Sequence, residues 1–298
     1  MLLRSLRAQR RRTWFLAAVT AATALAAAAA CGIDAVATKD FPGPPDASET
    51  GTVVLPPKPD GDVPDGGRVD ADADADARLG CLSDAGPLMV ALPDSGTCID
   101  ITEVSNEQYD QFLAATGGKP DAGAIGKPLP ASCAAVGSLQ REPVNQDAGP
   151  KLHPVARISW CSAFAYCAWA GKRLCGKVAT DRDASTGEWY GACSSAPAAN
   201  LYPYGMAYVA GRCNDNNVSG GPVAVGSFAG CTTTGSGVRD LSGNVEEWID
   251  SCDLGGNCAA AGSFYNNAPP DSTCHKSFDY PVALTDPAIG FRCCADQK

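Results

Sequence analysis

Leu241-Ser-Gly-Asn-Val-Glu-Glu-Trp248 is the stretch that decides the fold of this chain. Its middle carries Ser, Gly and Asn, which favour tight turns. It ends on Trp248, a side chain large enough to anchor a hydrophobic core. Taken by itself, the stretch predicts a turn that leads into a buried tryptophan.

Three helix signals lie upstream of this turn. Ser105-Asn-Glu-Gln108 has the form of a capping box, and Gly117 can end the helix that it opens. Ser159 can cap a second helix, which Gly171 would end. Ser185-Thr-Gly-Glu188 is a second capping box, and it predicts a short helix through Trp189 and Cys193.

The remaining sequence consists mostly of short runs that Gly, Asn, Pro and Ser interrupt. Val223–Phe228 and Ile289–Cys294 are long and apolar enough to predict short strands. Short helices and strands among long irregular segments indicate a loop-rich α+β domain.

Composition excludes several classes of protein. The chain has 298 residues, 15 cysteines and a formal net charge of −10. An acidic balance argues against a nucleic-acid partner, which needs a basic face for phosphates. His153 and His275 are the only histidines, so a three-histidine zinc site is excluded. So many cysteines are typical of an oxidising compartment.

Residues 1–31 have the layout of a secretory signal, with an arginine-rich start and an apolar, alanine-rich centre. They end in Ala28-Ala-Ala-Cys31-Gly32, which resembles a bacterial lipobox. The resemblance implies that Cys31 is lipidated and anchors an exported protein to the membrane of the bacterial cell envelope. Gly32 after the cysteine favours the outer membrane. The alternative is a plain signal that is cleaved after an alanine.

Residues 32–79 form an acidic linker rich in Pro, Gly, Ala and Asp, which is predicted to be disordered. Residues 80–298 follow as the globular domain, with the 14 cysteines that remain after Cys31. An even number in an exported chain indicates a disulfide framework. Cys293 and Cys294 are adjacent, and we expect them to pair with different partners.

Several segments, taken in order, resemble the formylglycine-generating enzyme family, also called sulfatase-modifying factors. The resemblance implies a variant of the C-type lectin fold with little regular secondary structure. The segments are Thr102–Tyr109, His153–Trp160, Gly171–Leu174, Glu188–Trp189, Tyr202–Gly205, Leu241–Trp248, Gly262–Phe264 and Gly290–Arg292.

The family's founding members oxidise a substrate cysteine to formylglycine with two cysteines and a copper ion. At the matching positions this chain has Asn266 and Asp271, which cannot supply the thiolates that copper(I) needs. Trp248 and Ser263 match positions in the family's substrate groove. The resemblance therefore implies the scaffold without the copper site.

The resemblance also implies calcium. One site would use the carbonyls of Ser242, Gly243 and Val245 with the side chain of Glu247, a set of oxygen ligands that suits a hard cation. Asn214 and the carbonyl of Asp215 match the start of a second calcium site, whose loop is shortened here.

Two functions remain open at this stage. One is a calcium-stabilised, non-catalytic binding module for a protein or glycan ligand. The other is an oxygen-dependent oxidoreductase with a different metal site, for which His275 and Asp271 are the candidates. A weak likeness of Glu142-Pro-Val-Asn145 to the sugar-binding loop of C-type lectins is a further route to glycan binding.

Overall fold

The computed structural model describes residues 80–298 except 82, 94, 144–148 and 177–186. All of these residues lie in the second of two compact units, Val63–Lys298. The predicted signal, its Cys31 and the acidic linker through residue 79 lie outside the described residues. Within the described part of the chain, no helix is long and apolar enough to cross a bilayer.

The first two predicted helices are confirmed. Helix α2 spans Asn106–Thr116, its capping box forms between Ser105 and Gln108, and Gly117 ends it in the left-handed conformation at φ 64°. Helix α4 spans Trp160–Trp169, and the Ser159 hydroxyl caps it by accepting from a backbone N–H. The sequence did not predict the short helix α3 (Ala122–Ile125) or the 3₁₀ turns η1 (Ala131–Cys133) and η3 (Pro269–Asp271).

Helix α5 spans Glu188–Cys193, so it begins later than the predicted capping box requires, and the predicted cap Ser185 lies outside the described residues. Gly187 is the N-cap and provides no side-chain bond. The Glu188 carboxylate instead accepts both guanidinium arms of Arg173, and it also accepts the Gly176 N–H and the Thr97 hydroxyl. Because an ion pair holds this carboxylate, it cannot turn back to cap its own helix.

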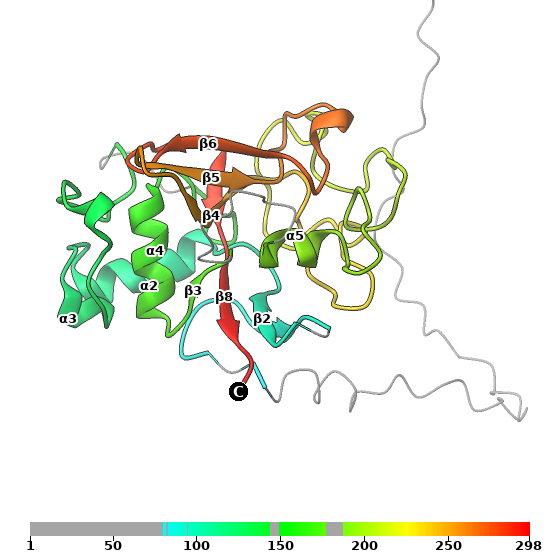
Figure 1. The fold of residues 1–298 in the computed structure, drawn as a ribbon. Coiled ribbons are helices and arrows are strands. Elements are labelled where there is room, and N and C mark those ends of the chain that lie inside the picture. Colours follow the sequence, from blue (N-terminus) through cyan, green and yellow to red (C-terminus); the bar gives the residue numbers. More distant parts are fainter. Residues whose placement is uncertain (1–79, 82, 94, 144–148, 177–186) are drawn as a thin grey trace, which may run out of the picture. The chain divides into compact units, whose positions relative to one another are not determined.

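Two four-stranded sheets form the centre of the domain (Figure 1). The first has the order β1-β2-β8-β3 and is antiparallel; its strands are Met89–Ala91, Thr97–Asp100, Cys293–Asp296 and Arg173–Leu174. The second has the order β6-β5-β4-β7; its strands are Ser277–Pro281, Asn257–Ala261, Glu246–Cys252 and Ile289–Phe291. Only β4 and β7 pair in parallel among these described strands.

The predicted strand Ile289–Cys294 consists of two short strands that belong to different sheets. Residues up to Phe291 belong to the second sheet and residues from Cys293 to the first, so the chain passes between the sheets at Arg292. The predicted strand Val223–Phe228 is wrong. Its Val223 N–H donates to a side chain, Asn244 Oδ1, and Gly226 turns the backbone at φ 73°, so no ladder forms.

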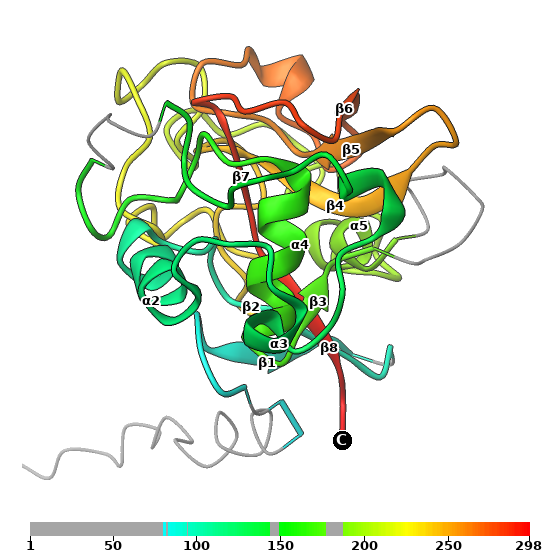
Figure 2. The same cartoon turned by 90° about the vertical axis from the view of Figure 1, so that its left-hand side faces the viewer.

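Helix α4 is central to the larger hydrophobic core (Figure 2). It contacts α2, α3 and β4, and an aromatic cluster fills the space between α4, α2 and β7. In that cluster the Tyr166 ring is 5.5 Å from Phe112 and 5.2 Å from Phe291, centre to centre. The predicted core role of Trp248 is also confirmed, since this residue is buried, as are Trp160 and Trp189.

Seven disulfides use every cysteine between residues 81 and 294. As predicted, the adjacent Cys293 and Cys294 bond to different partners. The pairs are Cys81–Cys98, Cys133–Cys161, Cys167–Cys293, Cys175–Cys294, Cys193–Cys274, Cys213–Cys231 and Cys252–Cys258. Such a framework is typical of a protein exported to an oxidising compartment.

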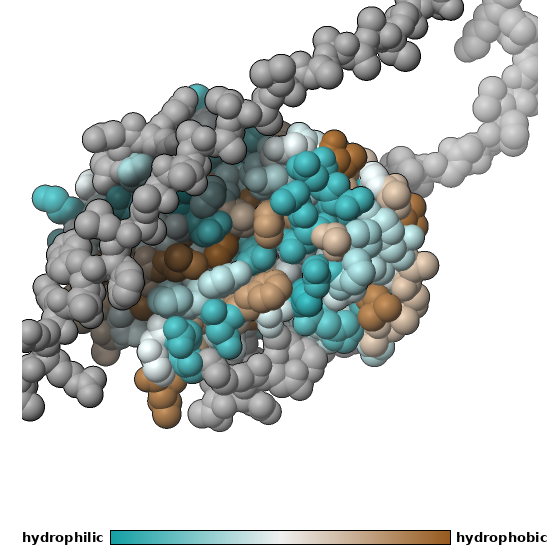
Figure 3. Space-filling view, turned by 90° about the horizontal axis from the view of Figure 1, so that it is seen from above, coloured by the Kyte–Doolittle hydropathy of each residue, from teal (hydrophilic) through white to brown (hydrophobic). Residues whose placement is uncertain are grey.

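The described surface seen from above is mixed in character (Figure 3). Hydrophilic side chains cover much of it, and hydrophobic ones lie between them. The large exposed hydrophobic residues are spread along the chain; they are Leu88, Leu152, Met206, Val209, Val218 and Leu254.

Candidate functional site

Asn266 and Asp271, which the resemblance places at the family's copper cysteines, lie in the segment after β5. Asn266 is exposed to solvent. Asp271 ends the turn η3, and its carboxylate lies 2.6 Å from Lys276 Nζ. Cys274 lies nearest to them in sequence, and it is bonded to Cys193. No free thiol therefore occurs among the described residues of this segment.

The two predicted groove positions are buried in the domain. Trp248 has no exposed surface, and its indole N–H donates to the Ile158 carbonyl at 3.1 Å. The Ser263 hydroxyl accepts the Gly243 N–H at 2.8 Å. Both side chains thus have structural hydrogen bonds that fix the turn at residues 241–248.

The carboxylate of Glu247, which was predicted as a calcium ligand, is bonded to a buried cation. Arg292 Nε donates to Oε2 and Arg292 Nη2 donates to Oε1, each at 2.7 Å, and the Trp189 indole N–H donates to Oε2 at 2.8 Å. A calcium ion would have to share this carboxylate with the guanidinium. The set with Ser242, Gly243 and Val245 fits an ion poorly in this arrangement, and calcium there stays a prediction.

The second predicted calcium set, Asn214 with the Asp215 carbonyl, has the better chemistry, because the Asp215 carboxylate lies beside it. Asn214 Oδ1 and Asp215 Oδ2 are both buried, and neither has a hydrogen-bond donor within the described part of the chain. The other Asp215 oxygen accepts the Tyr208 hydroxyl at 3.1 Å, and burial raises the pKa of this carboxyl. Buried oxygens that accept no hydrogen bond are suited to bind a hard cation or a water molecule. No group of three or more His, Cys, Asp or Glu side chains that could hold a metal occurs in the described ranges.

A cluster of buried acids surrounds Arg292. Glu103, Asp240 and Glu247 all face its guanidinium, so the carboxylates outnumber the cation. Burial, and next the charge of Asp240, raise the pKa of Glu103 well above its ordinary value. Glu103 Oε1 accepts the Asn244 amide at 2.8 Å, and Oε2 has no donor among the described residues. The Glu103 carboxyl also contacts that of Asp240. That contact is favourable only when one carboxyl carries a proton.

The two histidines do not form a site with the predicted acid. The ring of His275 packs 4.9 Å from that of Tyr190, whereas Asp271 pairs with Lys276. His153 lies elsewhere, in the loop before Pro154, where its carbonyl accepts the Asn106 N–H. The alternative metal site of His275 with Asp271 thus has no support in these contacts.

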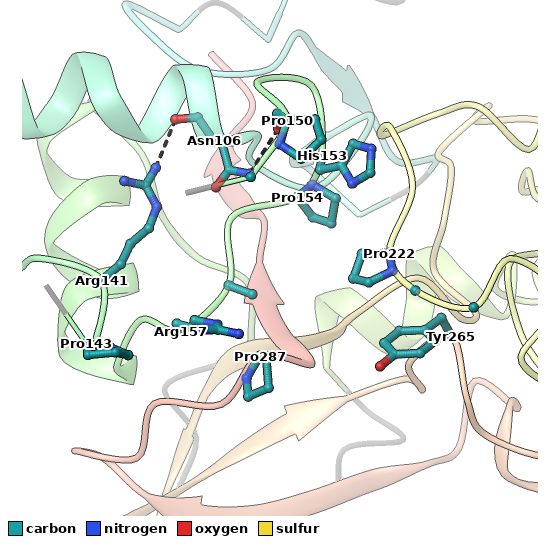
Figure 4. Close-up of a pocket in the computed structure, with 14 residues that line it drawn as sticks. Asn106, Arg141, Pro143, Pro150, His153, Pro154, Arg157, Pro222, Tyr265 and Pro287 are labelled. Atoms are coloured by element: carbon teal, nitrogen blue, oxygen red, sulfur yellow. Dashed lines mark hydrogen bonds between the residues drawn. The ribbon is translucent and has the colours of Figure 1, made fainter. Parts of the chain in front are cut away.

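A pocket of about 350 Å³ opens beside His153 (Figure 4). The start of α2 contributes Asn106, the loops before α4 contribute Arg141 and Arg157, and the segment after β5 contributes Tyr265. The sequence did not predict this site, because its residues are far apart in the chain and follow no motif spacing. Of the predicted sugar-binding loop, Glu142 and Pro143 are described, whereas Val144 and Asn145 lie outside the described residues.

The disulfide-stapled α+β domain, with its turn at residues 241–248 and its missing copper thiols, defines a class of protein: the formylglycine-generating-enzyme fold without the metal-binding cysteines. A family model for the sulfatase-modifying factor enzyme 1-like domain matches residues 65–297. The chain belongs to this family, and the resemblance stated from the sequence is confirmed.

The relatives include one that is named as an enzyme and one that is named as an inactive enzyme. The mouse formylglycine-generating enzyme is 25% identical over 257 residues, which cover 67% of this chain and 66% of the mouse protein. The bovine inactive C-alpha-formylglycine-generating enzyme 2 is 34% identical over 122 residues, or 36% of this chain and 38% of that protein. The chain thus spans less than two thirds of either relative. PvdO from Pseudomonas aeruginosa gives a TM-score of 0.49 at 18% identity and covers 73% of this chain and 91% of its own.

The buried acid pair predicts a pH dependence of stability. Folding raises the pKa of the Glu103 carboxyl above its ordinary value of 4.5. The contribution of this carboxyl to the free energy of unfolding is therefore full below pH 4.5, and it is lost as the pH rises through the folded-state pKa. Glu103→Gln keeps an acceptor for Asn244 and a permanent donor for Asp240. We expect the variant to lose less stability than the wild type between pH 5 and pH 8.

Urea unfolding at the two pH values, with all disulfides intact, measures this difference. Glu107→Gln, which alters an exposed acid on α2, is the matched control. An equal loss of stability in the wild type and in Glu103→Gln would show that this carboxyl does not hold the proton.

Proposed function

We propose that this chain is a non-catalytic binding module of the sulfatase-modifying factor family, held at the bacterial cell envelope by a lipid on Cys31 and stabilised by calcium. Its ligand is a protein or a glycan. One observation carries the proposal: every described cysteine is in a disulfide, and Asn266 and Asp271 stand where copper would need thiolates.

The chemistry of copper(I) supports the loss of activity. This ion prefers soft thiolate ligands, and an amide and a carboxylate are hard oxygen donors. The Asp271 carboxylate also has its own cation in Lys276. A relative whose name describes an inactive enzyme shows that the family includes such members.

Calcium is the cation that the buried oxygens of Asn214 and Asp215 would suit best. They lie next to the turn at residues 241–248, because the Asn214 carbonyl accepts the Asn244 N–H at 2.8 Å. An ion there would neutralise the buried Asp215 and would tie the loop to the turn. Its role would be structural.

The first prediction concerns catalysis. The mature protein, mixed with copper, a reductant, oxygen and a sulfatase-type cysteine peptide, should give no aldehyde above the level in peptide alone, because no thiolate pair can activate oxygen. Mass spectrometry of the peptide measures this, with the Streptomyces coelicolor formylglycine-generating enzyme as the positive control. Copper-dependent conversion of the cysteine to an aldehyde would refute the proposal.

The second prediction concerns the anchor. In a bacterial host the wild type should sediment with membranes and carry a lipid on an N-terminal Cys31. Cys31→Ser should remain uncleaved or appear in the soluble fraction. Membrane fractionation and mass spectrometry of the mature N-terminus test this. An unmodified N-terminus upstream of residue 31 in the wild type would contradict lipidation.

The third prediction concerns calcium. At a free calcium concentration 100 times the dissociation constant, binding should stabilise the wild type by about 2.7 kcal/mol and should raise its melting temperature. Asp215→Asn should lose most of this response, whereas Asp84→Asn, which alters an exposed acid, should keep it.

Thermal unfolding with calcium and with a chelator makes the measurement. Equal melting temperatures in both conditions would remove calcium from the proposal. An unchanged response in Asp215→Asn would remove Asp215 from the site.

A further inference from the structure

The pocket beside His153 brings positive charge together in an acidic protein. Arg141 and Arg157 line it, and none of its described lining residues is Asp or Glu, although the chain has a net charge of −10. Within the described residues, Arg141 pairs with Asp110, at 2.8 Å, and no ion pair involves Arg157. A half-buried guanidinium in such a place favours an anionic ligand.

The backbone holds Arg157 in an unusual conformation. Its φ is 59°, in the left-handed region that side-chain-bearing residues rarely adopt. Two hydrogen bonds of 2.9 Å fix it there, since its N–H donates to the Asp286 carbonyl and its carbonyl accepts the Glu142 N–H. Backbone strain of this kind is concentrated at functional sites, where it presents a side chain in one direction.

Asn106 provides a second and independent sign of a ligand. The residue is 3% exposed, and its Oδ1 has no hydrogen-bond donor among the described residues. Its Nδ2 donates to the Pro150 carbonyl at 3.1 Å, which fixes the orientation of the amide. Figure 4 shows Oδ1 directed into the space between Arg141, Arg157 and Pro154. A buried acceptor without a donor favours a ligand that brings an N–H or an O–H.

The walls between these polar groups are apolar rings. Proline rings supply no N–H of their own, and a tyrosine closes one side, so a ligand meets flat surfaces with few competing donors. The rings belong to Pro143, Pro150, Pro154, Pro222, Pro287 and Tyr265.

We infer that this pocket binds an acidic peptide, with a carboxylate on Arg157 and a backbone N–H donated to Asn106 Oδ1. The inference rests on the proposed binding function and names its ligand class. An extended peptide has the three features that the pocket complements: a charged side chain, a backbone amide and an apolar surface. A glycan would need an array of polar partners for its hydroxyls, whereas rings form much of this pocket.

An array of eight-residue peptides, made in pairs that differ only by Glu or Gln at one position, tests the inference on the mature protein. Because a bond to a charged partner is about twice as strong as a neutral one, we expect the best Glu peptides to bind about tenfold more tightly than their Gln partners. Arg157→Met should abolish this preference. Lys119→Met removes the same charge from an exposed site at the far end of α2 and should preserve it.

Fluorescence anisotropy with the labelled peptides gives the dissociation constants, and thermal unfolding confirms that each variant is folded. If Arg157→Met does not fold, Arg157→Lys replaces it and should keep a reduced preference. Equal binding of Glu and Gln peptides, an unchanged preference in Arg157→Met, or binding of acidic glycans instead of peptides would overturn the inference. If the peptide experiment fails, the predicted absence of aldehyde formation still stands, so the two proposals can fail separately.

Discussion

The ion pair between Glu247 and Arg292 is the interaction on which the rest of the domain depends. Arg292 lies where the chain passes from one sheet to the other, and its guanidinium also donates to the carbonyls of Asp100 and Arg239. Glu247 lies in β4 and also accepts from Trp189 of α5. One buried pair thus joins both sheets, a helix and a loop. Removing the Arg292 charge would leave the Glu247 carboxylate without its cation in the core, at a loss of about 3–5 kcal/mol.

The stretch 241–248, which carries Glu247, has little conformational freedom. The turn brings Gly243 against the neighbouring loop at φ 80°, and a Cβ on it would lie 2.3 Å from the Asn214 carbonyl oxygen. Ser263 and Asn214 fix the backbone of the turn on its two sides, through the N–H groups of Gly243 and Asn244. The turn therefore sets where Glu247 enters the core. The family motif is a geometric requirement of the backbone as much as a set of ligands.

The sequence predicted features that local chemistry determines and missed those that depend on distant partners. The caps of α2 and α4 were predictable because Ser105 and Ser159 bond within one turn. The separate bonds of Cys293 and Cys294 followed from their adjacency. Glu188 was misassigned because its partner, Arg173, is fixed by tertiary structure. The strands of two to seven residues carry too few positions for a pattern to emerge. The pocket combines residues from six separate segments of the chain.

The pocket and the lost copper positions belong to one piece of chain, since Tyr265 lines the pocket and Asn266 follows it. Copper chemistry would need two reduced thiols at this place, and the described cysteines are all committed to the framework that holds the loops together. Recognition needs only fixed loops, and the disulfides and the Glu247–Arg292 pair fix them without a metal centre at residues 266 and 271. The features that make the domain rigid are therefore compatible with the proposed binding, and they leave no described cysteine free as a thiol.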